Sequence, residues 1–404
     1  MKILFADSLP ESHLGRVRAA GHECLLMPEL TAEDLPDHVA GVDVLTVRST
    51  RVTQAAIEAS DRLSMIIRAG AGTNTIDKTA AADRGIYVCN VPGRNAIAVA
   101  ELAMGLLLAV DRRIPDNVAD LRSGEWNKSE YSRAAGLYGR TVGVIGLGSI
   151  GLAFAERAKA FGMTVLGIRK PGRSPAAESR IRSVGIRLVD DLETLLPRAD
   201  VVSLHVPAGD STRHMVDAGF LAAMKDGSIL INTSRGEVVD ESALLAELDS
   251  GRLRAGLDVY ESEPATGRAE FDSPLASHPS VVGTHHIGAS TAQAQSAIAD
   301  GVIELIGAYE RGEIIDCVNM ETLPAGSATV TVRHFNRVGV LARVLQVLRE
   351  EKLNVEQMEN HIFAGSTAAA ATLEVVGTVP DDLTERLDSL PEVIASSINA
   401  RADR

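Results

Sequence analysis

Residues 142–151 read Val-Gly-Val-Ile-Gly-Leu-Gly-Ser-Ile-Gly, and this stretch decides the fold of the chain around it. Its glycines Gly146, Gly148 and Gly151 have the spacing G-x-G-x-x-G between a strand-like run and an amphipathic, helix-like run. In a βαβ unit the first glycine allows a tight turn, the second lets a pyrophosphate approach the backbone, and the third lets helix and strand pack closely. Glycines that only shape a turn are the alternative, but the flanking strand and helix favour a dinucleotide site.

The residue expected to face the adenosine ribose is basic in this chain. In NAD-binding folds an Asp or Glu about twenty residues after the glycines accepts hydrogen bonds from the ribose hydroxyls. Here Arg169 follows the next strand-like run, TVLGI, with Lys170 and Arg173 close by. A carboxylate would repel a 2′-phosphate, whereas these cations attract one, so the cluster predicts NADP use. A solvated basic loop is the alternative, because charge clusters are common on protein surfaces.

Short β-rich runs alternate with helical patterns on both sides of this stretch. Upstream they are KILFAD, VDVLTV, SMIIRAG and IYVCNV; downstream the alternation continues to VVGTHHIGAS. Such alternation predicts parallel sheets with right-handed crossovers. We therefore predict an α/β fold with two doubly wound parallel-sheet domains. One is a flavodoxin-like domain for the substrate (1–97 and 287–316), and the other is a Rossmann domain for the cofactor (98–286).

The C-terminal part has a different pattern. Residues 317–327 include Pro324, Gly326 and Ser327 and read as a linker by composition. After them the order strand, helix, strand, strand, helix, strand predicts a ferredoxin-like βαββαβ module over residues 328–404.

The composition limits the possible classes of function. The 404 residues are 45% hydrophobic and 23% charged, which is typical of a globular protein of two or three domains. The formal net charge of -14 at pH 7 argues against a nucleic-acid binder. Cys24, Cys89 and Cys317 lack the spacing of a zinc site or a disulfide framework, so we expect buried thiols and no metal. Without a signal-peptide core or a membrane-length apolar run, we expect a cytoplasmic protein.

Three ionisable residues each follow a strand-like run in the second half of the chain. They are Arg235 in NTSRGEVVDE, Glu263 in GLDVYESEP and His286 in THHIGAS. Because the carboxyl ends of strands in an open α/β sheet face the ligand crevice, we expect them to converge. A histidine exchanges a proton with a hydroxyl near neutral pH, a carboxylate orients it, and a guanidinium holds a carboxylate in bidentate fashion. The set suits a 2-hydroxy acid and a hydride acceptor.

Seven motifs occur along the chain in the order of a known enzyme family: RAGAGTNTID, NVPGRNAIAVAELA, GEWNK, GVIGLGSIG, INTSRGEVVDE, LDVYESEP and HHIGAST. By these motifs the chain resembles the D-2-hydroxyacid dehydrogenases, and among them the D-3-phosphoglycerate dehydrogenases with a C-terminal ACT domain. The resemblance covers essentially the whole chain. It departs from the family at His285 and Val338, where family members usually or often have proline.

The resemblance implies roles for the three converging residues and for the cofactor site. Arg235 binds the substrate carboxylate and 2-oxygen, His286 is the acid/base, and Glu263 is its partner. Asp258 matches an aspartate near the nicotinamide carboxamide, although a turn cap is the alternative. Further positions that line the cofactor are Ser149, Ile150, Thr233, Ser234 and Gly288.

The resemblance also implies contacts with a phosphorylated substrate. Arg48, Ser49 and Arg51 follow a strand of the first domain, where a phosphate needs basic or polar groups to replace its hydration. Other substrate positions are Gly72, Asn95, Lys128 and Gln295. Trp126, the one tryptophan, either belongs to the loop beside Lys128 or packs in a core.

In the C-terminal module, His334, Asn336 and Asn354 stand where serine-binding ACT domains contact their effector. His334 and Asn336 are two residues apart and are expected to face the same way on a strand. The alternative is a module that serves only assembly, because buried Asn and His also fix registry.

The function favoured by this pattern is reversible hydride transfer between D-3-phosphoglycerate and a nicotinamide dinucleotide. The alternatives are an NADPH-dependent reductase of hydroxypyruvate or glyoxylate, favoured by Arg169, and a dinucleotide-sensing corepressor-like binding protein. NAD is the family's usual cofactor, whereas Arg169 points to NADP. The resemblance further implies a homodimer or homotetramer, with a long helix after Asn95 at the subunit contact.

Overall fold

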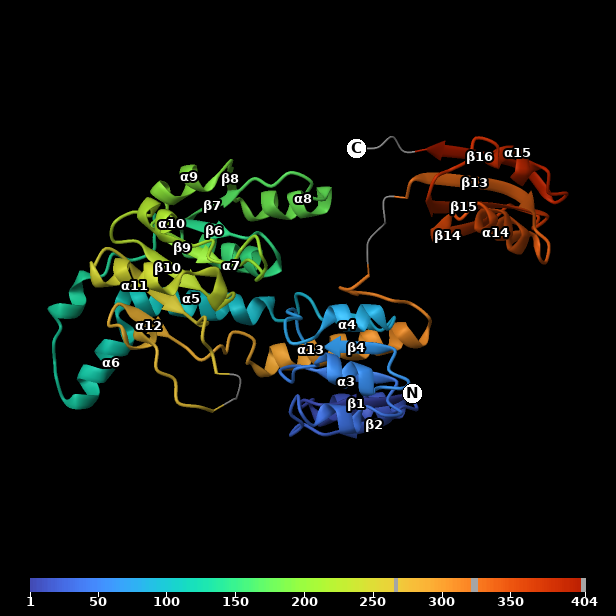
Figure 1. The fold of residues 1–404 in the computed structure, drawn as a ribbon. Coiled ribbons are helices and arrows are strands. Elements are labelled where there is room, and N and C mark those ends of the chain that lie inside the picture. Colours follow the sequence, from blue (N-terminus) through green and yellow to red (C-terminus); the bar gives the residue numbers. More distant parts are fainter. Residues whose placement is uncertain (265–267, 321–325, 401–404) are drawn as a thin grey trace. The chain divides into compact units, whose positions relative to one another are not determined.

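The computed structural model describes residues 1–264, 268–320 and 326–400 (Figure 1). The chain forms two compact units, Met1–Asn319 and Met320–Arg404. The division falls inside the predicted linker, of which residues 321–325 lie outside the described residues, as do residues 401–404 of the predicted module. Because both parallel sheets lie in the first unit, the predicted boundaries at 97/98 and 286/287 stay predictions.

The first unit begins with a five-stranded parallel sheet in the order β2-β1-β3-β4-β5. Its strands are β1 (Lys2–Phe5), β2 (Glu23–Leu26), β3 (Val44–Val47), β4 (Met65–Arg68) and β5 (Tyr87–Asn90). Its helices are α1 (Glu11–Ala19), α2 (Leu35–His38), α3 (Gln54–Ala59) and α4 (Lys78–Asp83). All four residues of β3, Val-Leu-Thr-Val, are buried, as expected for a parallel strand covered on both faces.

The chain then builds a seven-stranded parallel sheet in the order β12-β11-β10-β9-β6-β7-β8. Its strands are β6 (Thr141–Ile145), β7 (Thr164–Ile168), β8 (Arg187–Val189), β9 (Val201–Leu204), β10 (Ile229–Asn232), β11 (Arg254–Leu257) and β12 (Val281–Gly283). The strand order reverses beside β6. Such a switch point leaves a crevice at the carboxyl ends of the strands, and ligands of doubly wound sheets bind there.

Helices cover this second sheet, and two long helices stand out. The helices are α5 (Ala96–Arg112), α7 (Ser149–Ala160), α8 (Pro175–Val184), α9 (Leu192–Leu195), α10 (Ala218–Ala223), α11 (Glu241–Asp249) and α12 (Pro274–Ser277), with short 3-10 turns at Leu196–Arg198 and Gly236–Val238. α5 shares a buried core with β6 and β10 of the second sheet. α13 (Ala292–Glu310) instead packs on the first sheet, through Ile298 and Val302. Between α5 and β6 the chain forms α6 (Ile114–Ser123) and a 3-10 turn, Glu130–Arg133.

The second unit is an antiparallel sheet in the order β14-β15-β13-β16. The chain order is β13 (Ala328–Phe335), α14 (Val340–Glu350), β14 (Asn354–Ile362), β15 (Ala368–Val376), α15 (Leu383–Asp388) and β16 (Val393–Ala400). Inward residues such as Val330, Val344 and Leu373 form its core. This is a βαββαβ module, and the predicted α/β fold class is confirmed.

The cysteines differ from expectation. Cys89 is buried, but Cys24 and Cys317 are only half-buried, so the prediction of three buried thiols is wrong for two of them. Although they are distant in sequence, Cys89 and Cys317 oppose each other in an antiparallel bridge, and burial together with the neighbouring Cys317 raises the pKa of the Cys89 thiol to about 12. A thiol with this pKa is a poor nucleophile at neutral pH.

No helix in the part of the chain that the structure describes combines the length and apolar character that a membrane crossing requires. Within the same residues, no group of three or more His, Cys, Asp or Glu side chains is arranged to hold a metal ion.

Candidate active site

The glycine-rich turn between β6 and α7 combines close packing with open space. Gly146 has φ 97°, and a Cβ there would lie 2.3 Å from the His205 carbonyl oxygen. A Cβ at Gly151 would lie 2.0 Å from the Gly146 carbonyl oxygen. At Gly148, which caps α7, a Cβ would meet nothing within 4 Å. Packing therefore explains the first and third glycines, while the second leaves room in front of a helix N-terminus, where anionic groups bind.

A cavity of about 270 Å³ lies at the carboxyl ends of strands from both sheets of the first unit. Nine predicted site residues line it: Gly72, Asn95, Ile150, Thr233, Ser234, Arg235, Asp258, His286 and Gly288. Arg68 and His205 line it as well, although the sequence analysis assigned neither of them to the site. The fold thus brings together residues that are up to about two hundred positions apart in the chain.

The cavity contains polar atoms that the protein itself does not satisfy. Four buried side-chain atoms without a hydrogen-bond partner among the described residues line it: Arg68 Nε, Asn95 Oδ1, His205 Nδ1 and Thr233 Oγ1. Burial strongly lowers the pKa of His205, to about 3, so its imidazole is neutral at pH 7. Unsatisfied buried polar atoms are costly and call for a polar ligand. Together with the open space at Gly148, they fit a dinucleotide and a small polar substrate.

His286 and Glu263 form a hydrogen-bonded pair at the cavity. His286 Nδ1 lies 2.7 Å from Glu263 Oε2, and Glu263 Oε1 accepts the Tyr260 amide at 2.9 Å. Burial alone would raise the pKa of Glu263, but hydrogen bonds from His286 and Tyr260, with the charges of His286 and Arg235, bring it below its ordinary value. Glu263 is therefore a carboxylate at neutral pH, and it leaves Nε2 of His286 as the nitrogen that is free to exchange a proton.

Asp258 holds the loop that carries His286. Its buried carboxylate accepts hydrogen bonds from Thr284 Oγ1 (2.6 Å) and from the amides of Ile287 and Gly288 (both 2.9 Å). Its backbone carbonyl accepts the His286 amide at 2.7 Å. Asp258 therefore has the capping role that was the alternative to a cofactor contact. Its carboxylate accepts three hydrogen bonds, and one further lone-pair direction stays available to a ligand.

Arg235 follows β10 on a turn that one side chain fixes. Asn232 Oδ1 accepts the amide and the hydroxyl of Ser234, at 3.0 and 2.7 Å, and its Nδ2 donates to the Arg235 carbonyl at 2.9 Å. Arg235 Nη1 donates to the Ser234 carbonyl at 2.6 Å. The remaining donors of the guanidinium are available to a carboxylate in the cavity.

Three arginines gather at the end of the first sheet. Arg68 is the last residue of β4, and burial first, then the charges of Arg235 and Arg48, lowers its pKa to about 10. The Asp7 carboxylate at the end of β1 accepts the Arg48 amide at 2.7 Å and the Ser49 hydroxyl at 2.6 Å. Sequence reasoning missed Arg68, although its place at the carboxyl end of a strand was a usable signal.

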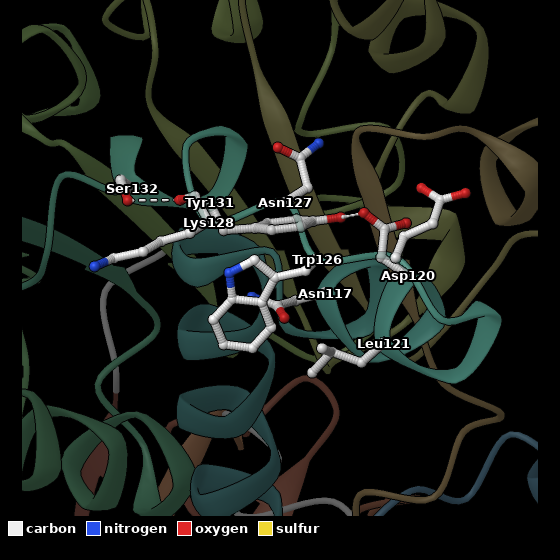
Figure 2. Close-up of a pocket in the computed structure, with 9 residues that line it drawn as sticks. Asn117, Asp120, Leu121, Trp126, Asn127, Lys128, Tyr131 and Ser132 are labelled. Carbon is white, nitrogen blue, oxygen red and sulfur yellow. Dashed lines mark hydrogen bonds between the residues drawn. The ribbon is translucent and has the colours of Figure 1, made fainter.

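Other predicted substrate residues lie away from the cavity. Ser49, Arg51 and Gln295 are exposed, and none of them lines it. Lys128 lines a different pocket, which residues of α6 also line. The Lys128 side chain extends away from Asp120 in this pocket (Figure 2). Trp126 lines the same pocket and is 82% exposed, so the core-packing alternative for this residue is wrong.

The basic loop after β7 is exposed. Arg169 donates from Nε to Asp190 at 3.2 Å, and the two side chains are 61% and 84% exposed. Arg173 donates to the Ile168 carbonyl at 2.9 Å, while Lys170 is exposed beside them. An exposed ion pair of this kind contributes little to stability.

In the second unit the three predicted effector residues are not equivalent. His334 is buried, with Nδ1 at 2.8 Å from the Phe335 carbonyl and Nε2 at 3.2 Å from Asn360 Oδ1. Asn336 is exposed and lies beyond β13, which ends at Phe335, so the expectation that both residues share one strand face is wrong. Asn354 is exposed and donates to Glu356.

The chain is similar to known proteins over most of its length. The family described as "D-isomer specific 2-hydroxyacid dehydrogenase, NAD binding domain" matches residues 104–288. A D-3-phosphoglycerate dehydrogenase from Methanocaldococcus jannaschii is 43% identical over 80% of this chain, but the match spans only 60% of that relative's length. A hydroxypyruvate reductase from Thermotoga maritima is 44% identical over 69% of this chain and 88% of its own. A putative D-3-phosphoglycerate dehydrogenase from Schizosaccharomyces pombe is 36% identical over 97% of this chain and 86% of its own.

Solved structures agree with the fold of the first unit. An acyclic imino acid reductase in complex with NADPH and D-Arg superposes with a TM-score of 0.69 at 29% identity, covering 79% of this chain and 100% of that chain. An NAD-dependent formate dehydrogenase from Staphylococcus aureus in complex with NAD gives a TM-score of 0.67 at 27% identity over 79% of this chain and 99% of its own. The matching family model describes an NAD binding domain, so the family supports a nicotinamide dinucleotide as the cofactor. With its glycine-rich turn and its Arg, Glu and His set at the strand ends, the chain belongs to the D-isomer-specific 2-hydroxyacid dehydrogenase family.

Proposed function

We propose that the chain catalyses the reversible oxidation of D-3-phosphoglycerate to 3-phosphohydroxypyruvate, the first step of serine biosynthesis. The observation that carries this proposal is that His286, hydrogen-bonded to Glu263, lines the same cavity as Arg235. The identity of 43% and 36% to relatives named D-3-phosphoglycerate dehydrogenase supports the substrate. So does Arg68, which lines the cavity and gives it a basic end, with Arg48 near enough for its charge to help lower the pKa of Arg68.

The proposed mechanism assigns one task to each side chain. Arg235 pairs with the substrate carboxylate and fixes the orientation of the acid. His286 Nε2 takes the proton of the 2-hydroxyl, and Glu263 stabilises the imidazolium that forms. In the reverse direction the same nitrogen returns the proton to the 2-oxo group. The Gly148 turn and Thr233 would hold a nicotinamide dinucleotide, which would supply or accept the hydride at C2 when bound.

Steady-state rates with paired substrates test this proposal. In the reductive direction kcat/KM should be at least tenfold higher for 3-phosphohydroxypyruvate than for hydroxypyruvate, because the basic end of the cavity pairs only with the phosphate. A preference for hydroxypyruvate or glyoxylate would refute the proposed substrate and leave the family unaffected. A reductase of those unphosphorylated acids is the second candidate, and the 44% identity to the Thermotoga hydroxypyruvate reductase favours it.

We also propose that the enzyme prefers NADP, on the basis of Arg169 and Lys170 at the end of β7. Arg169→Asp should move the ratio of kcat/KM for NADP over NAD toward NAD by roughly tenfold or more, about 1.4 kcal/mol. The Asp190→Asn variant is the matched control, because it frees Arg169 from its one ion pair and should not favour NAD. An unchanged ratio in Arg169→Asp would exclude Arg169 from the cofactor site.

For the second unit we propose a serine site that includes His334, Asn336 and Asn354. The polar contact between His334 and Asn360 supports it, since a serine at that place would exchange hydrogen bonds with the same atoms. Serine should slow the wild-type enzyme and affect His334→Ala much less. An equal response of the two proteins would remove His334 from the site.

We further propose a homodimer or homotetramer in which α6 faces a second copy of this chain. Leu121 on α6 is 52% exposed and Trp126, in the segment after α6, is 82% exposed; both line one pocket, and Lys128 does not line the cavity of its own chain. The double variant Leu121→Ser/Trp126→Ser should therefore lower the mass measured by light scattering. An unchanged mass would place the subunit contact elsewhere.

A further inference from the structure

Cys89 and Cys317 lie directly opposite each other, although they are distant in the sequence. Cys89 belongs to β5, and Cys317 belongs to residues 314–319, which follow α13 and which we call the strap. Two backbone hydrogen bonds, of 3.1 and 2.8 Å, join the residues on either side of the two cysteines. The cysteines are therefore a non-hydrogen-bonded antiparallel pair, in which the Cα atoms lie about 4.5 Å apart and the side chains come closest. This separation falls in the range of about 4.4–6.8 Å that a disulfide requires.

The side chain of Asn319 fixes the strap on β5. Its Oδ1 accepts the Val88 amide at 2.8 Å, and its Nδ2 donates to the Ile86 carbonyl at 2.8 Å. The Cys317 thiol donates to the same Oδ1 at 3.2 Å. Burial first, and then the charge of Cys317 and a hydrogen bond between the two thiols, raises the pKa of Cys89. The two thiols are therefore in contact, and no backbone movement is needed to join them.

The two thiols differ in how an oxidant reaches them. Cys89 is buried, and its raised pKa makes it a poor nucleophile. Cys317 is half-buried, so a small oxidant reaches its sulfur first. Neither cysteine lines the catalytic cavity, and the proposed mechanism uses neither of them. Chemistry at this pair is thus separate from the hydride transfer.

We propose that Cys89 and Cys317 form an intramolecular disulfide when the enzyme meets hydrogen peroxide. The Cys317 sulfur attacks the peroxide, the O–O bond breaks, and a sulfenic acid and one water form. The Cys89 sulfur then attacks the Cys317 sulfur, the S–O bond breaks, and the Cys89 proton leaves with the hydroxide as a second water. Two thiols are oxidised and one hydrogen peroxide is reduced to two waters, so atoms and electrons balance.

The disulfide stabilises the first unit without changing its catalysis. It closes a loop of about 230 residues, which lowers the entropy of the unfolded chain. It also joins the strap covalently to β5 at the place where hydrogen bonds hold the strap. Pairing with Cys89 further protects the Cys317 sulfur from oxidation to a sulfinic acid, which is irreversible. The disulfide involves no substrate group, so it does not depend on the proposed function.

The test treats the protein with a slight excess of hydrogen peroxide. In the wild type, peptide mapping should find Cys89 linked to Cys317, and the Tm should rise by about 3 °C or more. Dithiothreitol should reverse both changes. Cys317→Ser keeps the donor to Asn319 but should show no rise in Tm with peroxide, and Cys89→Ala should show none either. Each variant is compared with itself before and after peroxide, so its own stability does not affect the result.

Cys24→Ser is the matched control, because Cys24 is half-buried like Cys317 but lies opposite Ile3. It should keep both the linkage and the rise in Tm. Unreacted thiols at both positions, a sulfinic acid at Cys317 with Cys89 still free, or an equal rise in Tm in Cys317→Ser would overturn the disulfide. A fall of kcat/KM by more than about twofold in the oxidised wild type would mean that the disulfide inhibits the enzyme, and would overturn its purely stabilising role.

Discussion

His286 adopts a backbone conformation that non-glycine residues rarely adopt, with φ 51°. Three features hold it there: the hydrogen bond from its amide to Asp258, the Asp258 carboxylate that fixes the following amides, and the contact of its ring with Glu263. The sequence predicted His286 and Glu263 because each follows a strand-like run. The same signal was present for Arg68, which ends β4, but the sequence analysis did not use it.

The role of Glu263 is tested by Glu263→Gln, which keeps a hydrogen-bonding side chain but removes the charge. Because the imidazolium then forms without its counter-charge, kcat should fall by about 10²-fold to 10⁴-fold while KM changes little. Steady-state kinetics in both directions measure this. A rise in KM with kcat unchanged would mean that Glu263 acts on substrate binding and not through His286.

A matched control for Glu263→Gln is available at Glu261, two residues earlier in the chain. Glu261 also pairs with a histidine, His214, at 3.0 Å, but neither residue lines the cavity. Glu261→Gln removes the same charge from the same loop, so it should keep kcat within about twofold of wild type.

At the scale of elements, the sequence indicated the strands and helices well because their patterns are local. The glycine spacing, the buried apolar runs of the parallel strands and the alternation in β13 depend on neighbouring residues alone. The sequence could not indicate features that depend on contacts between residues far apart in the chain. One is the opposition of Cys89 and Cys317, and another is the end of β13 one residue before Asn336. The separation of Lys128 from the cavity depends on how α6 and its loop fold back.

In the glycine turn, cofactor binding and close packing depend on different glycines, so separate variants can test the two roles. Gly148 has φ −82°, which any residue adopts, and open space around it, so Gly148→Ala should fold with an unchanged Tm. The added methyl group would nevertheless stand where the pyrophosphate approaches, and the Kd for the dinucleotide should rise at least tenfold, or about 1.4 kcal/mol. Gly151→Ala should instead lower stability by about 1–3 kcal/mol, because its Cβ would overlap the Gly146 carbonyl.

Thermal unfolding and a fluorescence titration with the dinucleotide measure these two effects separately. Gly15→Ala in α1 is the control for a glycine with free space, and it should stabilise the protein by roughly 0.5–1 kcal/mol. Equal losses of stability in Gly148→Ala and Gly151→Ala would contradict the division of tasks.

At the scale of the whole molecule, the first unit divides its chemistry between two sheets. The first sheet places Arg68 at the cavity, and the second supplies the glycine turn, Arg235 and the His286 that is hydrogen-bonded to Glu263. All of these lie at carboxyl ends of strands. The opposite ends of the strands are therefore free to stabilise the fold, and Asp200 is the clearest case.

Asp200 ties together three strands at their amino ends. Its carboxylate accepts the Thr141 amide at 2.8 Å and pairs with Lys225, and its carbonyl accepts the Ile229 amide at 3.1 Å. Burial alone would raise the pKa of Asp200, but the hydrogen bonds from Lys225 and Thr141 and the charges of Lys225 and Arg140 bring it below 3.8. The unfolded chain thus binds this proton more readily than the folded one.

The sign of the pH dependence follows from that shift. The stabilisation by Asp200 is complete above pH 3.8 and is lost as the pH falls through its lower pKa in the folded protein. Asp200→Asn should therefore lower the free energy of unfolding by about 1–3 kcal/mol at pH 7, and this deficit should shrink as the pH falls below 3.8. Urea unfolding followed by circular dichroism at neutral and acid pH measures it. The control Asp226→Asn removes an 87% exposed carboxylate near Arg252 and should behave as wild type. A deficit that is the same at both pH values would mean that the Asp200 charge does not stabilise the sheet and that only its shape matters.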